Sequence, residues 1–101
     1  MRYNLRHLRV FLAVAETASV TRAAEACRVS QPAVTQALAK LETALGAALF
    51  TRTPHGLYLN AAGDIFVVRV KRALSLLDPV LSDIAPRLRL TVTAAQIEAL
   101  I

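Results

Sequence analysis

One face of a predicted helix over residues 31–45 carries polar side chains that are spaced to form hydrogen bonds with a single partner. With about 100° between successive residues, the two sides of this helix can be assigned from the sequence. One side is apolar and holds Val34, Leu38, Leu41 and Leu45. The opposite side and its flanks hold Pro32, Thr35, Gln36, Ala39, Lys40 and Thr43. Because the apolar side must face a core, the second side is left for a partner.

The chemistry of this free face fits the major groove of duplex DNA. The amide of Gln36 can pair with adenine through two hydrogen bonds, and Thr35 offers both a hydroxyl and a methyl group. Pro32 is flat and allows close approach, and Lys40 suits a phosphate better than a base. Gln31 stands at the helix N-terminus, where free N–H groups and the helix dipole favour a phosphate. For each residue alone, an ordinary solvated position is the alternative, and only the surrounding pattern weighs against it.

A first helix is predicted over residues 4–17. Its periodic apolar positions are Leu5, Leu8, Phe11, Leu12 and Ala15. Arg6 and Arg9 fall on the other side, and His7 is assigned to the outer, solvated side. No function is assigned to His7 on this basis.

A second short helix and a tight link lead into the helix with the polar face. Ser19 is a suitable N-cap for a helix over residues 20–27, and Ser30 is one for the helix over 31–45. Gly46 is a natural residue to follow the end of that helix. Two short helices joined by a tight turn, the second with a polar outer face, predict a helix-turn-helix.

A two-stranded hairpin is predicted after the three helices. Residues 49–52 and 57–60 are strand-like, and residues 53–56 supply Pro and Gly for a turn. Asn60 then caps a long helix that begins near Ala61. The hairpin is expected to form a wing beside the helix-turn-helix.

The long helix carries an apolar heptad pattern. The spacing of its seam residues is 4, 3, 4, 3 and 4, over Phe66, Val70, Ala73, Leu77, Val80 and Ile84. A long helix leaving a small domain has little else to bury this seam, so we expect a homodimer; an intramolecular core is the alternative. Pro79 predicts a kink or break near residues 78–79.

Composition restricts the classes of function. The net charge is +5, of which residues 1–60 hold seven basic and three acidic residues, or +4. That surplus favours a polyanion. The single cysteine, Cys27, and two distant histidines give no metal-ligand spacing, and no nucleophile–base set or phosphate-binding glycine loop indicates an enzyme. We expect no cofactor, no membrane span and, since the N-terminus lacks an apolar signal core, a cytoplasmic location.

Residues 1–63 resemble the N-terminal domain of LysR-type transcriptional regulators. The matching stretches are Phe11-Leu12-Ala13-Val14-Ala15-Glu16, Ser19-Val20-Thr21-Arg22-Ala23-Ala24-Glu25, Val29-Ser30-Gln31-Pro32-Ala33-Val34-Thr35, Leu41-Glu42, Leu45-Gly46, Leu49-Phe50-Thr51-Arg52 and Ala62-Gly63. The resemblance implies a bacterial regulator that binds operators with dyad symmetry. It also implies antiparallel pairing of two linker helices, assembly into tetramers and an effector-binding domain further along the chain.

The same resemblance implies a set of DNA contacts. From the helix over 31–45 these would come from Ser30, Gln31, Pro32, Thr35 and Gln36, with a phosphate contact from Thr21. The wing would contribute Arg52, Thr53, His55 and Gly56 at the flanking minor groove or backbone. His55 stands where the family commonly has arginine or lysine, which halves the expected charge of the wing at neutral pH.

The predicted fold is therefore mainly α. A winged helix-turn-helix with three helices and a two-stranded wing covers residues 1–60, and a linker or dimerisation helix covers residues 61–89. Residues 90–101 would begin a further domain, which opens either with a strand at 90–93 or with a second helix-turn-helix after residue 95. Two other functions remain as alternatives: a nonspecific architectural DNA binder, and a protein-interaction module that has lost DNA binding.

Overall fold

The computed structural model describes residues 4–84, with side chains described as far as residue 76. The elements along the chain are α1 (Leu5–Thr17), α2 (Val20–Cys27), α3 (Gln31–Leu45), β1 (Phe50–Thr53), β2 (Gly56–Leu59) and α4 (Ala61–Ile84). The predictions for residues 85–101 lie outside the described residues, as do the side chains of Leu77, Val80 and Ile84. The predicted order of three helices, hairpin and long helix is confirmed, and the boundaries of α1, α2, α3 and the two strands and the start of α4 lie within one residue of the prediction.

Each helix begins at a polar side chain that accepts a backbone hydrogen bond. The hydroxyl of Ser19 accepts from the N–H of Arg22 at 3.1 Å, and that of Ser30 accepts from Ala33 at 3.2 Å. The amide oxygen of Asn60 accepts from the N–H of Gly63 at 2.8 Å. These three predicted caps are confirmed, and they explain why the chain starts helices at these points.

The hairpin is antiparallel, and its register pairs Phe50 with Leu59 and Thr53 with Gly56. A hydrogen bond joins the start of the hairpin to α3: the carboxylate of Glu42 on α3 accepts it from the N–H of Leu49 at 2.6 Å. The side-chain amide of Asn60 donates to the carbonyl oxygen of Ala48 at 2.8 Å. The hairpin is thus tied to the segments on both sides of it.

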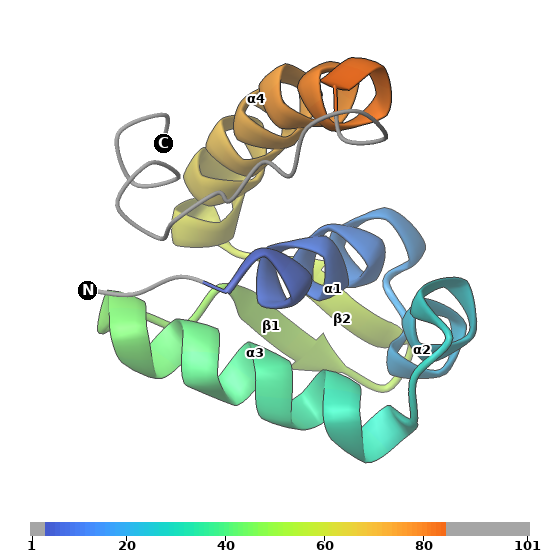
Figure 1. Cartoon of the computed structure of the whole chain (residues 1–101). Helices are drawn as coiled ribbons and strands as arrows, with labels where there is room; N and C mark the ends of the chain where they lie inside the picture. The colour runs from blue at the N-terminus through green and yellow to red at the C-terminus, as the bar shows by residue number, and fades with distance from the viewer. Residues whose placement is uncertain (1–3, 85–101) are drawn as a thin grey trace.

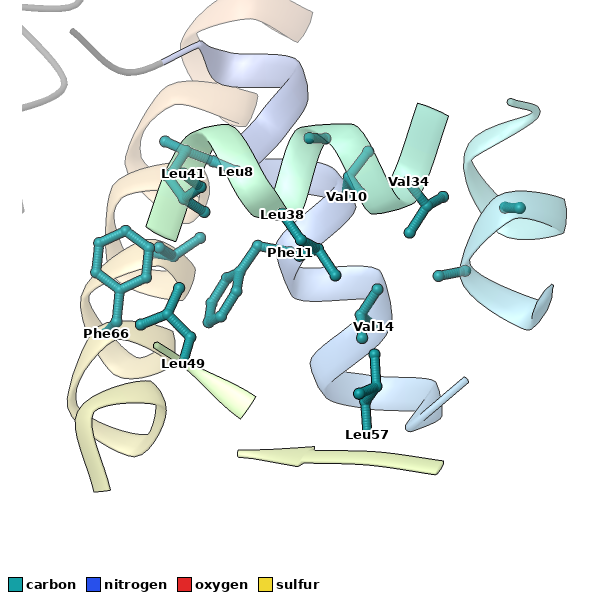
Figure 2. Packing of buried hydrophobic residues seen from close by; sticks show 14 of the residues in the cluster. Leu8, Val10, Phe11, Val14, Val34, Leu38, Leu41, Leu49, Leu57 and Phe66 are labelled. Atoms are coloured by element: carbon teal, nitrogen blue, oxygen red, sulfur yellow. The ribbon is translucent and has the colours of Figure 1, made fainter. Parts of the chain in front are cut away.

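The core is built around Phe11, which is completely buried in α1 (Figure 2). Its ring lies 5.1 Å from that of Phe66 on α4 and 5.5 Å from that of Phe50 on β1, measured between centroids. Leu38 on α3 and Leu49 before β1 belong to the same cluster. One side chain of α1 therefore holds together elements from both ends of the fold. Figure 1 shows α1 between α3 and α4.

The inner side of α4 packs on its own chain. Phe66, Val70 and Leu74 belong to the core cluster, and Ala73 is also buried. The prediction that Phe66, Val70 and Ala73 form a dimer seam is therefore wrong, and the intramolecular alternative holds for these three. The physical reason is that helical periodicity marks a buried side without saying whether the burying surface belongs to the same chain.

Proline does not interrupt α4. The helix is continuous from Ala61 to Ile84 and includes Pro79, so a break near residues 78–79 is not present. A proline inside a helix lacks its own N–H and crowds the preceding turn, yet the hydrogen bonds on either side can keep the helix intact.

Candidate nucleic-acid interface

The polar face of α3 is exposed as a continuous surface. Val34, Leu38 and Leu41 are buried, as the apolar stripe predicted, and Leu45 is half-buried. The exposed residues of α3 include Gln31, Pro32, Thr35, Gln36, Ala39, Lys40 and Thr43. The predicted orientation of the helix is therefore confirmed. Contact of these side chains with DNA stays a prediction.

The link between α2 and α3 sets the angle at which this face is presented. Arg28 adopts a left-handed backbone conformation with φ 56°, and its N–H donates to the carbonyl oxygens of Ala24 and Glu25. The N–H of Val29 donates to the carbonyl oxygen of Ala24 at 3.0 Å. Ala23 and Ala24 are both buried, and their small side chains let the neighbouring helices approach. These features produce the compact turn of a helix-turn-helix.

The wing is fixed against the start of α2. The N–H of Leu57 donates to the carbonyl oxygen of Ala18 at 3.0 Å. Gly56 has φ 141°, and a Cβ atom at this position would lie 2.2 Å from the same oxygen. Gly56 is therefore required for close approach of two backbones, which is a structural role that the sequence did not reveal.

An open groove of 420 Å³ lies where the wing meets the turn before α2. It is lined by Ser19 and by the wing residues Arg52, Thr53, His55 and Gly56, among others. Thr21 is exposed in the first turn of α2. The wing residues predicted to meet DNA thus come together beside the N-terminal end of α2.

The turn of the wing uses part of the hydrogen-bonding capacity of these residues. The hydroxyl of Thr53 donates to the carbonyl oxygen of Gly56 and accepts from the N–H of His55, both at 3.1 Å. Thr53 therefore shapes the turn, and its capacity for a further bond is reduced. Arg52 and His55 are exposed. These two side chains carry the basic groups of the wing.

His7 was assigned to solvent from the sequence, and that assignment is wrong. The residue is half-buried and lines a groove of 210 Å³ between the start of α1 and the middle of α3. Burial lowers the pKa of His7, and the positive charges of Lys40 and Arg6 lower it further. A signal was available: Val10, three residues further along α1, is apolar and buried, so position 7 shares its inward face.

Other kinds of site find little support in the described part of the chain. Residues 4–84 contain no group of three His, Cys, Asp or Glu side chains that could hold a metal ion. Cys27 is a half-buried free thiol packed against the core. Within the same range, no helix has the combination of length and apolar character that crossing a bilayer requires.

The fold begins with three helices, of which α2 and α3 form a helix-turn-helix, and α3 has a polar outer face. A two-stranded hairpin packs beside them (Figure 1). These features define a winged helix-turn-helix. Residues 5–64 match the profile described as "Bacterial regulatory helix-turn-helix protein, lysR family". Because this match covers more than half of the chain, the protein belongs to the LysR family of transcriptional regulators.

Curated relatives agree with this assignment. The chain is 44% identical over 86 residues to the HTH-type transcriptional regulator IlvR of Caulobacter vibrioides, covering 85% of this chain and 29% of that protein. It is 41% identical over 98 residues to the regulator PtxR of Pseudomonas aeruginosa, covering 92% and 31%. The chain therefore spans about a third or less of the length of these relatives.

Solved structures of the family share the fold. The crystal structure of the CbnR DNA-binding domain in complex with DNA has a TM-score of 0.74 at 37% identity, covering 84% of this chain and all of that one. The BenM DNA-binding domain in complex with benA site 1 DNA has a TM-score of 0.75 at 34% identity, covering 79% and 93%. A Corynebacterium glutamicum OxyR C206 mutant reaches 0.81 at 32% identity, covering 86% and 28%.

Proposed function

We propose that this chain is the DNA-binding part of a LysR-type transcription regulator and that it recognises a specific operator through α3. The observation that carries the proposal is the exposed polar face of α3, fixed in orientation by the buried side chains behind it. Relatives that share the fold include two DNA-binding domains solved in complex with DNA. Binding requires no chemical transformation, so we assign no enzymatic activity. Such a regulator acts in the bacterial cytoplasm, where the chromosome lies.

In this proposal α3 enters the major groove and its exposed amides and hydroxyls read base edges. Gln36 pairs with adenine, Thr35 contacts a base or its methyl group, and Gln31 lies at the N-terminal end of the reading helix. The hydroxyl of Ser30 caps α3, so Ser30 acts mainly by positioning. Pro32 allows close approach of the helix to the bases.

In this proposal, Lys40 and Thr21 and then the wing contact the DNA outside the base edges read by α3. Lys40 and Thr21 are exposed and face phosphates in this proposal. The wing brings Arg52 and His55 to the flanking minor groove, with Thr53 and Gly56 shaping its turn.

In this proposal, a second copy of the chain is needed to recognise a complete operator. One helix reads only a few base pairs, and a symmetric dimer places two such helices about 34 Å apart along a dyad-symmetric operator. We assign the interface to the outer side of α4, where Ile65, Val68 and Leu76 are 62%, 63% and 50% exposed. Large apolar side chains this exposed on one helix are typical of a surface that a partner covers. In a full-length protein, further domains would extend this dimer to a tetramer and add an effector site.

The decisive experiment selects bound sequences from a random DNA pool and then measures affinity for the selected site. Gln36→Ala should weaken binding by about 1–3 kcal/mol at the preferred site and relax the preference at one base pair. Ala47→Ser, an exposed and neutral position in the loop before β1, serves as the control. Equal affinity for selected and random DNA at matched salt would instead identify a nonspecific binder. No binding to either would leave a protein-interaction module.

A further inference from the structure

The groove between α1 and α3 has the composition of an anion site. Arg6 and His7 line it from the first turn of α1, and Lys40 lines it from α3. None of the described residues that line it is acidic. Gln36 lines the groove as well as belonging to the polar face of α3. The groove is therefore continuous with the surface that meets the bases in the proposed function.

The charges in this groove are close enough to act on one another. Lys40 and Arg6 both disfavour a proton on His7, in addition to the effect of its burial. Bringing like charges together costs free energy, and an anion placed among them recovers that cost. All three side chains donate hydrogen bonds when protonated, and neither Arg nor Lys can accept one. An oxygen-rich anion satisfies such a set of donors.

We propose that this groove holds one backbone phosphate of the bound operator between Arg6 and Lys40, and that His7 takes up a proton as the phosphate enters. The proposal rests on the proposed function and extends it, because it adds α1 to the DNA-contacting elements and links DNA binding to pH. The phosphate is chosen as occupant because Gln36 and Lys40 belong to the groove and to the reading face at once. Charge-assisted bonds from guanidinium and ammonium groups to phosphate are short and strong.

The direction of the pH effect follows from the charges around His7. In the free protein, burial and the cations Lys40 and Arg6 hold the pKa of His7 below its ordinary value. A phosphate in the groove offsets the two positive charges and accepts a hydrogen bond from the protonated ring, which raises that pKa. The complex then binds a proton that the free protein lacks, so operator affinity increases as pH falls between the two pKa values. Among the described residues, Arg6 from α1 and Lys40 from α3 are the charged groups that face His7.

The test measures operator affinity by fluorescence anisotropy between pH 7.5 and pH 6, using a duplex selected by the wild-type chain. Linkage to a single proton should raise wild-type affinity by about threefold to tenfold over this range. His7→Gln should lose this increase. Because the proposed function also places His55 against DNA, the wild-type and His7→Gln chains are each compared in a His55→Gln background, so that the difference between them isolates His7. Circular dichroism of both variants confirms that each is folded.

Two further readouts separate this proposal from the proposed function. The salt dependence of binding should lose about one counterion in Arg6→Ala, a residue to which the proposed function gives no DNA contact, and none in Lys71→Ala, an exposed lysine on α4. NMR titration of the His7 imidazole should show its pKa rise when the operator is added. The groove proposal is overturned if His7→Gln keeps the full pH dependence or if the His7 titration is unchanged by DNA. The proposed function survives that result if Gln36→Ala still weakens selective binding, and absence of any operator binding overturns both.

Discussion

Replacing Gly56 with alanine tests how the wing is held, and the structure supplies the magnitude. A Cβ atom at Gly56 would lie 2.2 Å from the carbonyl oxygen of Ala18, whereas real Cβ contacts under 3.0 Å are essentially never seen. The wing must therefore move away by at least 0.8 Å, the difference between these distances. A displacement of that size along the hydrogen bond would lengthen the distance between the Leu57 nitrogen and the Ala18 carbonyl oxygen from 3.0 Å to about 3.8 Å, which breaks the bond.

The expected loss in the free energy of unfolding combines two effects. The lost hydrogen bond costs about 1 kcal/mol. The positive φ of 141°, which suits glycine, costs a side chain about 1–3 kcal/mol. We therefore expect Gly56→Ala to destabilise the domain by about 2–4 kcal/mol, measured as a lower midpoint of urea unfolding with an unchanged slope. Affinity for the selected operator should fall as well, because the wing is displaced.

Of the other two glycines, Gly46 provides a control and Gly63 a second test. Gly46 has φ 69° and open space around its Cβ position, so Gly46→Ala should cost only the backbone penalty of about 1 kcal/mol. Gly63 lies within α4, where alanine would gain about 1 kcal/mol in helix propensity. Its Cβ, however, would lie 2.1 Å from the carbonyl oxygen of Leu49, so a net loss of stability is expected. The reasoning is refuted if Gly56→Ala costs no more than Gly46→Ala.

Two further predictions concern the core and the dimer. Phe11→Ala removes the ring that contacts Phe50 and Phe66, and we expect a loss of about 3–5 kcal/mol in urea unfolding; a loss below about 2 kcal/mol would contradict the central role of this residue. Val68→Asp places a charge on the exposed apolar side of α4, so sedimentation should show a shift from dimer to monomer while circular dichroism shows an unchanged helix content. Ala47→Asp, in the exposed loop before β1, should leave the dimer intact. Persistence of the Val68→Asp dimer at micromolar concentration would remove this side of α4 from the interface.

Features that depend on neighbouring residues were predictable from the sequence. Ser19, Ser30 and Asn60 cap helices through residues three positions away, so a local pattern contains the whole interaction. The outward orientation of Gln36 follows from the leucines on the same helix. For this reason the helix boundaries and the polar face of α3 agree with the expectations.

Features that depend on distant residues were not predictable in the same way. Periodicity identified Phe66 and Val70 as buried, but only the position of α1 shows that their own chain buries them. His7 faces Lys40, which is far from it in the sequence, and its role depends on that proximity. The demand for glycine at position 56 comes from the carbonyl oxygen of Ala18, which no local pattern reveals.

The position of α1 between α3 and α4 has a consequence for how such a regulator changes over evolutionary time (Figure 1). The side chains to which the proposed function assigns base reading lie on the exposed side of α3, so single surface substitutions would alter the preferred sequence without disturbing packing. In the proposed dimer, the distance between the two α3 helices would instead be set through α1, whose buried Phe11 contacts α4 directly. Changing the half-site spacing therefore requires coordinated changes in a close-packed interior. The preferred operator sequence can therefore change through single substitutions, whereas the spacing of the half-sites can change only when several buried residues change together.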